Sequence, residues 1–321
     1  MSDLSRSREE GPLILFAGSS NPNLARKIAR HLDIELGDAF AGQFPNGETQ
    51  IRIEENVRGA DVFVLQSPQG EDVDHSLMEL LVMIDALRRA SARRITAVVP
   101  YLPYARQEKK TAGREPITAK LVANLIATAG ANRVLTIDMH APAIEGFFDI
   151  PVDHLRAAPL LAQHFLHFNP DEIVVVSPDV GGVERANKFR QRLGTTLAIV
   201  AKQRLGPNST EVVEMVGEVK GKIAILVDDQ VSTGSTLVGA ASVLIQRGAV
   251  EVRACATHGL FPLGAFDFLC DSPLEEIVVT DTLPEVEEAP GSKFQTVSVA
   301  PVLAEAIRRI HENRSVSALF D

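Results

Sequence analysis

The amino-acid sequence predicts an α/β protein with two units in tandem, each a mostly parallel β-sheet flanked by helices. Short runs rich in Val, Ile and Leu recur along the chain, as expected of parallel strands covered on both faces. Segments with helical periodicity separate these runs, and this alternation is typical of α/β layers. The second half also repeats the pattern of the first half, which indicates a duplicated unit.

The candidate strands are short apolar runs. They are LILFAG from Leu13, VFVLQ from Val62, ITAVVP from Ile95, VLTIDM from Val134, EIVVVS from Glu172, KIAILVDD from Lys222, EVRACAT from Glu251 and EIVVTD from Glu276. Between the second and third runs, apolar residues recur with helical spacing at Leu77, Leu80, Leu81, Ile84 and Leu87. One apolar stripe of this kind predicts an amphipathic helix.

The repeat has a constant offset over a whole helix–strand segment. Thr118 and Thr236, Gly130 and Gly248, and His140 and His258 are each separated by the same 118 positions. Upstream, Ser67 and Ser177 each follow an apolar run and precede Pro. We therefore predict a boundary near residue 157, with one domain at 12–157 and a second at 158–321.

Composition excludes several classes of function. The chain has 321 residues, a formal net charge of -10, no Trp and two Tyr, which disfavours a general nucleic-acid binder. Cys255 and Cys270 form no C-x-x-C pair, so neither a disulfide scaffold nor a zinc site is expected. The polar N-terminal segment is not a secretory signal, and no apolar run is long enough to span a membrane. We expect a soluble cytoplasmic protein.

One segment has the composition of a sugar-phosphate site. An apolar run ends in Asp228 and Asp229, and the small residues Ser232, Thr233, Gly234, Ser235 and Thr236 precede a predicted helix. Backbone N–H groups at a helix N-terminus favour an anion, and glycine permits close approach to a phosphate. The two acids suit ribose hydroxyls or a bridging Mg²⁺. The alternative is a cluster of Ser and Thr that only caps the helix.

This segment resembles the phosphoribosyl-diphosphate loop of the type I phosphoribosyltransferase fold. The chain from about Leu13 to Phe320 resembles the ribose-phosphate pyrophosphokinase family in FPNGE, RGADVFVLQS, PYARQEKK, REPITAKLVAN, DMHAPAIEGFFDIPVDHL, SPDVGG, VVTDTLP and SVSALF. The resemblance implies two tandem type I-like domains, of which the first binds ATP and the second binds ribose 5-phosphate. It also implies that the last helix, about 302–321, packs on the first domain.

The implied activity is transfer of diphosphate from ATP to ribose 5-phosphate, giving AMP and 5-phospho-α-D-ribose 1-diphosphate for nucleotide, histidine and tryptophan biosynthesis. Mg²⁺ is the implied cofactor, and the implied assembly is dimers that form a hexamer. The implied ATP contacts are Phe44, Asn46 and Glu48, supplied by a neighbouring subunit, together with Arg106 and Gln107. The implied metal-linked residues are His140 and Asp179. Lys202 and Arg204 correspond to the basic pair of a mobile catalytic loop.

The loop departs from the family pattern at two positions. Ser232 stands where a third acid is usual, and Ser235 stands where a second glycine is usual. Two alternatives therefore stay open. One is a phosphoribosyltransferase that consumes the same product, and the other is a non-catalytic partner subunit of an active synthetase.

Overall fold

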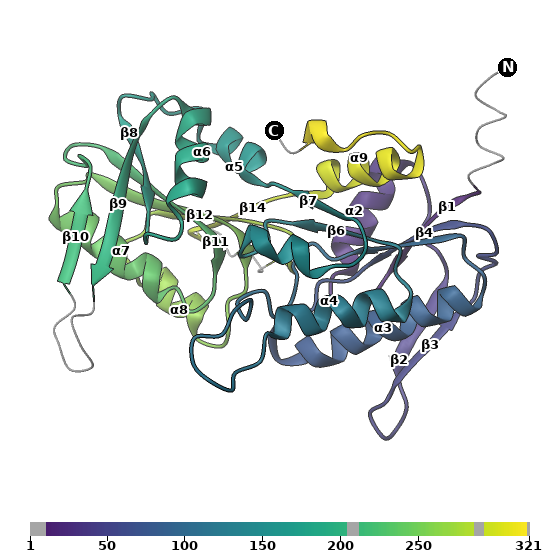
Figure 1. Cartoon of the computed structure of the whole chain (residues 1–321). Coiled ribbons are helices and arrows are strands. Elements are labelled where there is room, and N and C mark those ends of the chain that lie inside the picture. Colours follow the sequence, from purple (N-terminus) through teal and green to yellow (C-terminus); the bar gives the residue numbers. More distant parts are fainter. Residues whose placement is uncertain (1–10, 204–211, 286–291, 320–321) are drawn as a thin grey trace, which may run out of the picture. The chain divides into compact units, whose positions relative to one another are not determined.

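The computed structural model describes residues 11–203, 212–285 and 292–319 (Figure 1). The chain divides into two compact units. Unit 1 comprises Met1–Arg156, Thr282–Pro284 and Val299–Asp321, and unit 2 comprises Ala157–Asp281 and Glu285–Ser298. The last described helix of the chain therefore belongs to the same unit as the first strand.

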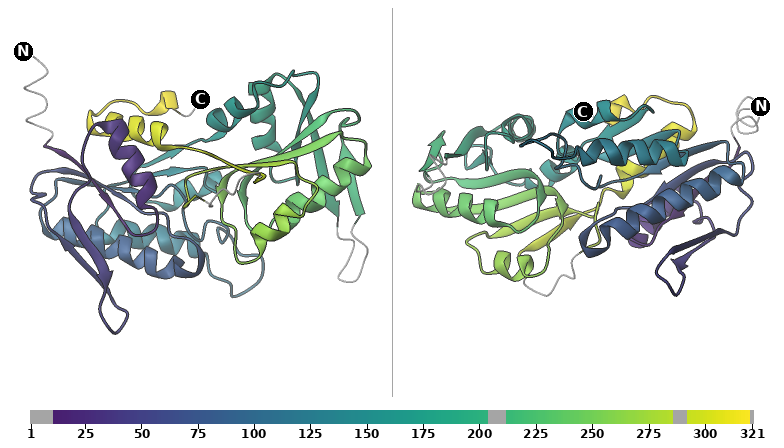
Figure 2. Two further views of the ribbon diagram at one scale, coloured as in Figure 1. Left: turned by 180° about the vertical axis from the view of Figure 1, so that it is seen from behind. Right: turned by 60° about the horizontal axis from the view of Figure 1, so that its bottom comes forward.

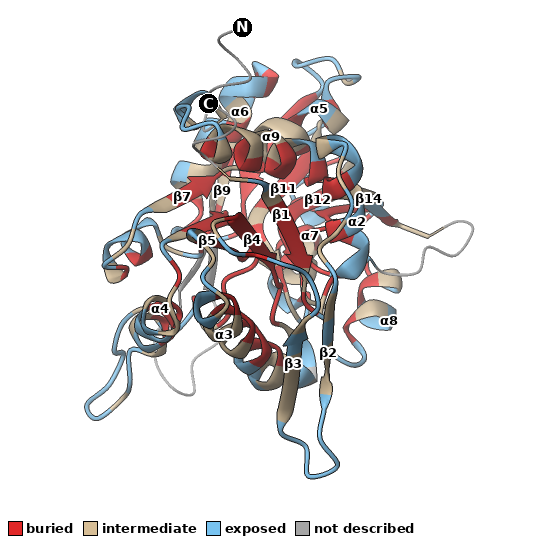
Figure 3. Ribbon diagram, turned by 90° about the vertical axis from the view of Figure 1, so that its right-hand side faces the viewer, coloured by how far each residue is buried: buried red, intermediate tan, exposed pale blue. Residues whose placement is uncertain are grey.

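Unit 1 contains a parallel sheet with the strand order β1-β4-β5-β6-β7. Its strands are β1 (Leu13–Ala17), β4 (Asp61–Leu65), β5 (Arg94–Val98), β6 (Arg133–Ile137) and β7 (Val152–Leu155). Every residue of β4 is buried, because helices cover both faces of the sheet (Figure 3). The continuous apolar runs of the sequence arise from this double coverage.

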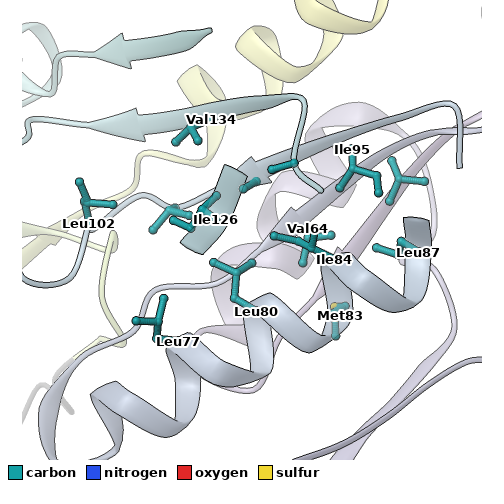
Figure 4. Packing of buried hydrophobic residues seen from close by; sticks show 14 of the residues in the cluster. Val64, Leu77, Leu80, Met83, Ile84, Leu87, Ile95, Leu102, Ile126 and Val134 are labelled. Atoms are coloured by element: carbon teal, nitrogen blue, oxygen red, sulfur yellow. The ribbon is translucent and has the colours of Figure 1, made fainter. Parts of the chain in front are cut away.

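Two helices lie side by side on one face of this sheet, and two others lie on the opposite face (Figures 1 and 2). The first pair is α3 (Val73–Arg89) and α4 (Thr118–Ala129), and the second pair is α2 (Pro22–Leu32) and α9 (Ala300–His311). The apolar stripe of α3 points into the core, where Leu80 and Ile84 lie among side chains of the sheet and of α4 (Figure 4). The short 3-10 turns of the unit are Gly70–Asp72, Pro142–Phe147 and Ser317–Leu319.

A β-hairpin stands outside this sheet and packs on α3. It consists of β2 (Ala39–Gln43) and β3 (Thr49–Ile53), which pair antiparallel. Our set of candidate strands did not include this hairpin, because its residues are half-buried or exposed and form no continuous apolar run.

A buried ion cluster attaches α9 to unit 1. Asp61, at the start of β4, is fully buried and accepts hydrogen bonds from Arg94 Nε at 2.7 Å and from Arg94 Nη2. His311 Nδ1, at the end of α9, lies 2.9 Å from Asp61 Oδ2. Arg94 also donates to the carbonyl of Ile310 at 2.8 Å. Burial alone would raise the pKa of Asp61, but the hydrogen bonds from His311 and Arg94 lower it.

Unit 2 contains a larger sheet with the order β10-β9-β8-β11-β12-β13-β14, parallel except for β10 against β9. Its strands are β8 (Ile173–Ser177), β9 (Thr196–Gln203), β10 (Val212–Val216), β11 (Ile223–Val231), β12 (Glu251–Gly259), β13 (Glu276–Thr280) and β14 (Phe294–Val297). In contact with the sheet, α5 packs on β12 and β13, α6 packs on β8, β9 and β11, and α7 packs on β11 and β12. The helices are α5 (Ala158–Phe165), α6 (Val183–Leu193), α7 (Ser235–Gln246) and α8 (Ala265–Cys270).

The two sheets share a common segment. The order β4-β5-β6-β7 in unit 1 matches β8-β11-β12-β13 in unit 2, and α4 and α7 occupy equivalent places before β6 and β12. Gly130 and Gly248 both follow these helices with positive φ, at 124° and 90°. The predicted fold class, two α/β units with mostly parallel sheets, is confirmed. Among the helices that the structure describes, none is both long and apolar enough to cross a membrane.

Candidate functional site

The acid pair of unit 2 lies near the carboxyl end of β11, a central strand of the sheet. The predicted apolar run ended in Asp228 and Asp229, and the strand continues two residues further, through Val231. Arg185 Nη1 lies 2.9 Å from Asp228 Oδ1, and Arg185 Nη2 lies 3.1 Å from Asp229 Oδ1. One guanidinium therefore bridges two adjacent carboxylates.

Burial and the neighbouring acid make Asp228 harder to ionise. Desolvation, followed by the hydrogen bond and the charge of Asp229, raises the pKa of Asp228 to about 7, although the charge of Arg185 acts in the opposite direction. Carboxyl ends of parallel strands are where open α/β sheets bind ligands. Carboxylates in this position can accept hydrogen bonds from hydroxyl groups, and the pKa of Asp228 makes its charge change near neutral pH.

The loop between β11 and α7 has the geometry expected of an anion site. Gly234, at the N-cap of α7, has φ 81° and ψ -10°, and no described side chain caps the helix. A Cβ at this position would lie 2.5 Å from Leu269 Cδ2, so only glycine fits both the backbone conformation and the space. Thr233, Ser235 and Thr236 are exposed, and Ser232 is half-buried. The amide donors of the first turn of α7 are thus available to a ligand.

Asp179 lies in the turn between β8, the strand next to β11, and α6. Its Oδ1 accepts the Gly182 amide at 2.8 Å, and its carbonyl accepts the Ser177 hydroxyl at 2.7 Å. These bonds fix the start of α6, whose first turn contains Arg185. The structure therefore brings the predicted Asp179 turn and the predicted acid pair together through one arginine.

His140 lies in unit 1, in the turn after β6, and its side chain is exposed. The turn contains Asp138 at φ 39°, an uncommon conformation for a residue other than glycine. The Met139 amide donates to His154 Nε2 at 2.8 Å, and His154 Nδ1 contacts Glu145. Burial and the charge of Arg156 lower the pKa of His154, so its Nε2 stays an acceptor. Neutral His154 thus holds the turn that presents His140.

Phe44, Asn46 and Glu48 lie in the tip of the β2–β3 hairpin, and all three are exposed. The Phe44 amide donates to the Glu48 carbonyl at 2.8 Å, and Gly47 adopts φ 87° between them. The Asn46 side chain accepts the Glu48 amide at 3.3 Å. The tip is therefore a closed turn that presents an aromatic ring on a protruding ribbon.

Arg106 and Gln107 lie in the segment between β5 and α4, and both are exposed. The Gln107 amide donates to the Tyr104 carbonyl at 2.9 Å, and Gln107 Oε1 accepts the Thr118 hydroxyl at 2.5 Å. Tyr104 has φ 61°, which is rare for an aromatic residue and typical of functional sites. These contacts place the two residues in a defined turn at the start of α4.

The two residues predicted to be catalytic, Lys202 and Arg204, lie where the described part of the chain ends at residue 203. Lys202 belongs to β9, where its backbone pairs with Val213 of β10, but its side chain and all of Arg204 lie outside the described residues. Among the described residues, no group of three or more His, Cys, Asp or Glu side chains could hold a metal ion.

Sequence reasoning missed Arg185. A signal was present, because a cation in the first turn of a helix opposes the helix dipole and needs another reason to be there. The acid pair supplies that reason. Tyr104 gave no comparable signal, since its unusual φ is not visible in the sequence.

Two family models match the chain. Residues 13–130 match the N-terminal domain of ribose phosphate pyrophosphokinase, and residues 203–321 match the phosphoribosyl synthetase-associated domain. Together these matches cover parts of both units.

Full-length relatives agree with these models. A ribose-phosphate pyrophosphokinase of Caldanaerobacter subterraneus is 54% identical over 314 residues, 98% of this chain and 99% of that protein. One from Clostridium acetobutylicum is 51% identical over 95% of this chain and 96% of that protein. The crystal structure of phosphoribosylpyrophosphate synthetase from Mycobacterium smegmatis is 45% identical, covers 94% of this chain and 99% of that chain, and superposes with a TM-score of 0.88. The chain therefore belongs to the ribose-phosphate pyrophosphokinase family.

Proposed function

We propose that this chain is a ribose-phosphate diphosphokinase that transfers the terminal diphosphate of ATP to the C1 hydroxyl of ribose 5-phosphate. The products are AMP and 5-phospho-α-D-ribose 1-diphosphate. The observation that carries the proposal is the bridged acid pair beside an open helix N-terminus in a chain of this family.

Unit 2 supplies the ribose 5-phosphate site in this proposal. Amide groups of the Ser232–Thr236 loop bind the 5-phosphate, and the hydroxyls of Thr233 and Thr236 add donors. Asp228 and Asp229 would repel the phosphate, so we assign them to the ribose hydroxyls, from which carboxylates accept hydrogen bonds. Ser232 adds a hydroxyl where the family usually has a third acid. In our proposal the two remaining acids, Asp228 and Asp229, bind the two adjacent hydroxyl groups of the ribose.

Unit 1 supplies the ATP contacts. Phe44 stacks on the adenine, while Asn46 and Glu48 bond its polar edge. Arg106 and Gln107 contact the nucleotide from a second segment, and an arginine can both stack on a purine and pair with phosphate. We propose that the hairpin of one subunit serves the site of a neighbour, within dimers that assemble to a hexamer.

Mg²⁺ is the cofactor that we propose. Proteins usually hold this ion through one or two carboxylates together with waters and substrate phosphates, so a cluster of three protein ligands is not required. Asp179 has one oxygen bonded to Gly182 and a second oxygen that fits a hard cation. We propose His140 as a metal-linked residue of unit 1. Bound Mg²⁺ would supply neutralisation of phosphate charge.

The reaction proceeds by attack of the ribose 1-oxygen on the β-phosphorus of ATP. The bond between this phosphorus and the α,β-bridging oxygen breaks, AMP leaves, and the 1-hydroxyl loses its proton. The protein contributes positioning and charge stabilisation. Lys202 and Arg204 neutralise the charge that develops on the phosphates, and a closed site excludes water that would hydrolyse ATP.

The deciding assay combines the protein with ATP, Mg²⁺ and ribose 5-phosphate and measures AMP and phosphoribosyl pyrophosphate. We expect both products in equal amounts. Absence of AMP would instead favour a non-catalytic partner subunit. Release of pyrophosphate only when a nucleobase is added would favour a phosphoribosyltransferase.

A variant tests the role of Lys202. Lys202→Ala should lower kcat by about two orders of magnitude, because its charge acts mainly in the transition state. The KM for ribose 5-phosphate should change by less than about threefold. Equal losses in both constants would assign Lys202 to ground-state binding.

A further inference from the structure

The first two turns of α3 are fixed to the ends of two strands by a buried polar network. Glu79 is almost fully buried, and its carboxylate accepts the Ser19 amide at 2.6 Å, the Ser19 hydroxyl at 2.8 Å and Gln66 Nε2 at 2.9 Å. Gln66 Nε2 also donates to the Ser76 carbonyl at 3.1 Å. Ser19 follows β1 and Gln66 follows β4, so the start of α3 is tied to the carboxyl edge of the sheet. Satisfied buried networks of this kind are rigid.

Asp74, in the first turn of α3, holds the segment that contains Arg106. Its carboxylate accepts a hydrogen bond from the Tyr104 hydroxyl. The hydrogen bond to Asp74 raises the pKa of Tyr104, so the phenol remains a donor. The Tyr104 carbonyl accepts the Gln107 amide, and Tyr104 has the strained φ of 61°. A strained backbone conformation persists only where surrounding contacts hold it in place, and the hydrogen bond to Asp74 is one such contact for Tyr104.

His75, the next residue, holds the hairpin. Its Nε2 lies 3.0 Å from Gln43 Nε2, and its Nδ1 lies 3.4 Å from Thr49 Oγ1. Gln43 ends β2, Thr49 begins β3, and the two are paired across the hairpin directly before its tip. The imidazole therefore contacts both strands at the base of the Phe44–Glu48 turn. Its Nε2 also lies 3.9 Å from Glu79 Oε2, which links the hairpin to the buried network.

Such restraint matters because a two-stranded hairpin is only marginally stable by itself. A mobile tip would lose conformational entropy when it bound a nucleotide, and that loss would weaken binding. The same holds for an exposed turn such as Tyr104–Gln107. A rigid helix turn that contacts both segments would lower this cost for each of them.

We propose that Asp74 and His75 are positioning residues of the ATP site, Asp74 through Tyr104 and His75 through Gln43 and Thr49. The inference rests on the proposed function, which assigns ATP contacts to the hairpin tip and to Arg106 and Gln107. Neither residue touches the reacting atoms. Their effect is to preorganise two binding segments from one helix turn.

Steady-state kinetics of Asp74→Ala and His75→Ala in the full chain provide the test. The KM for ATP should rise about five- to tenfold, as expected for one lost hydrogen-bonding restraint. The KM for ribose 5-phosphate should stay within about twofold, since that site lies in unit 2. His75→Gln, which keeps polar atoms near both strands, should recover part of the ATP affinity. Asp85→Ala is the matched control and should leave both constants unchanged, because within the described part of the chain Asp85 forms an ion pair only with exposed Arg89 on the same helix.

A double-mutant cycle separates positioning from general loss of stability. Tyr104→Phe removes the hydroxyl and keeps the packed ring, so it remains informative if Asp74→Ala unfolds. If Asp74 acts through Tyr104, the double variant should have the same KM for ATP as either single variant. Independent, multiplying effects would overturn this part of the proposal. So would equal increases in both KM values, which would indicate a structural role only.

Phe44→Ala and Arg106→Ala distinguish failure of this inference from failure of the proposed function. If these variants raise the KM for ATP but the Asp74 and His75 variants do not, the positioning role is wrong and the ATP site stands. If they leave the KM for ATP unchanged, the assignment of the ATP site itself is wrong, and the positioning role is refuted with it.

Discussion

Arg185 Nη1 lies 2.9 Å from Asp228 Oδ1, and this ion pair joins the first turn of α6 to the central strand of the unit 2 sheet. The same guanidinium reaches Asp229 at 3.1 Å. Two adjacent carboxylates repel each other, and a single shared cation offsets that repulsion. Arg185 therefore sets both the position and the charge of the proposed ribose site.

Replacement of Arg185 should weaken ribose 5-phosphate binding. In Arg185→Ala, Asp228 and Asp229 lose their shared partner, and we expect the KM for ribose 5-phosphate to rise by about tenfold or more. Arg185→Lys should recover little, since an ammonium group cannot bridge two carboxylates as a planar guanidinium does. Lys188→Ala on the same helix removes an exposed ion pair with Glu184 and serves as the control. Unchanged substrate affinity in Arg185→Ala would show that the pair does not bind ribose.

The raised pKa of Asp228 predicts a pH dependence of substrate binding. Because this pKa is about 7 in the folded protein, the carboxylate is mostly ionised above pH 7 and mostly protonated below it. Hydroxyl groups of ribose bond best to the ionised form, so the KM for ribose 5-phosphate should rise as the pH falls through 7. The phosphate of the substrate also titrates, and Asp228→Asn removes only the protein contribution. Identical pH profiles for the two proteins would contradict the assignment.

The same pKa has a consequence for stability. Folding raises it above the ordinary value of 3.8, so the folded state binds this proton more tightly than the unfolded state does. The associated stabilisation is present below the ordinary value and is lost as the pH rises towards about 7. Chemical denaturation of Asp228→Asn should therefore show a smaller loss of unfolding free energy over this pH range than the unsubstituted protein.

Gly234→Ala should damage both stability and phosphate binding. An alanine at φ 81° costs about 1–2 kcal/mol in backbone strain, and its Cβ would also clash with Leu269. We expect a lower thermal midpoint and a large rise in the KM for ribose 5-phosphate. Gly221→Ala is the control, because Gly221 has φ 73° but no atom within 4 Å of an added Cβ. If the two variants behaved alike, the loop geometry at Gly234 would have no special role.

Asp61→Asn should destabilise unit 1 by about 3–5 kcal/mol, since it leaves Arg94 without its buried partner.

The lowered pKa of Asp61 also predicts how stability depends on pH. The ionised carboxylate stabilises the folded state above the ordinary pKa, and this stabilisation is lost as the pH falls through the lowered pKa. Acid titration of unfolding should show a smaller pH effect in the variant. Glu54→Gln breaks the exposed contact with Arg52 and should cost less than about 1 kcal/mol.

The fold was largely predictable because parallel strands covered on both faces leave a strong signal. Runs such as Val62–Leu65 and Val174–Val176 are fully buried, and the 118-residue repeat corresponds to α4–β6 and α7–β12. The β2–β3 hairpin escaped prediction because it is not buried in a sheet and its pattern reflects packing on α3.

The part of the candidate site that the sequence could predict consists of residues that are close together in one short segment. Asp228, Asp229 and Gly234 are adjacent in the sequence, and their chemistry follows from that order. Arg185, Tyr104 and His75 depend on contacts between elements that are far apart in the chain. Arg185 and Asp228 come within 2.9 Å of each other because β8 and β11 are neighbours in the sheet, and this strand order could not be predicted from the sequence.

The return of the chain to unit 1 constrains the order in which the protein matures. Of the described α-helices, α9 leaves the ribosome last, yet it packs on α2 and supplies His311 to the buried carboxylate of Asp61. Until that helix emerges, the apolar face that α9 covers stays exposed, and the Asp61–Arg94 pair lacks its contacts with His311 and Ile310. Unit 2 comprises Ala157–Asp281 and Glu285–Ser298, and α9 is not part of it. Truncation of the last helix should therefore harm the domain that is made first.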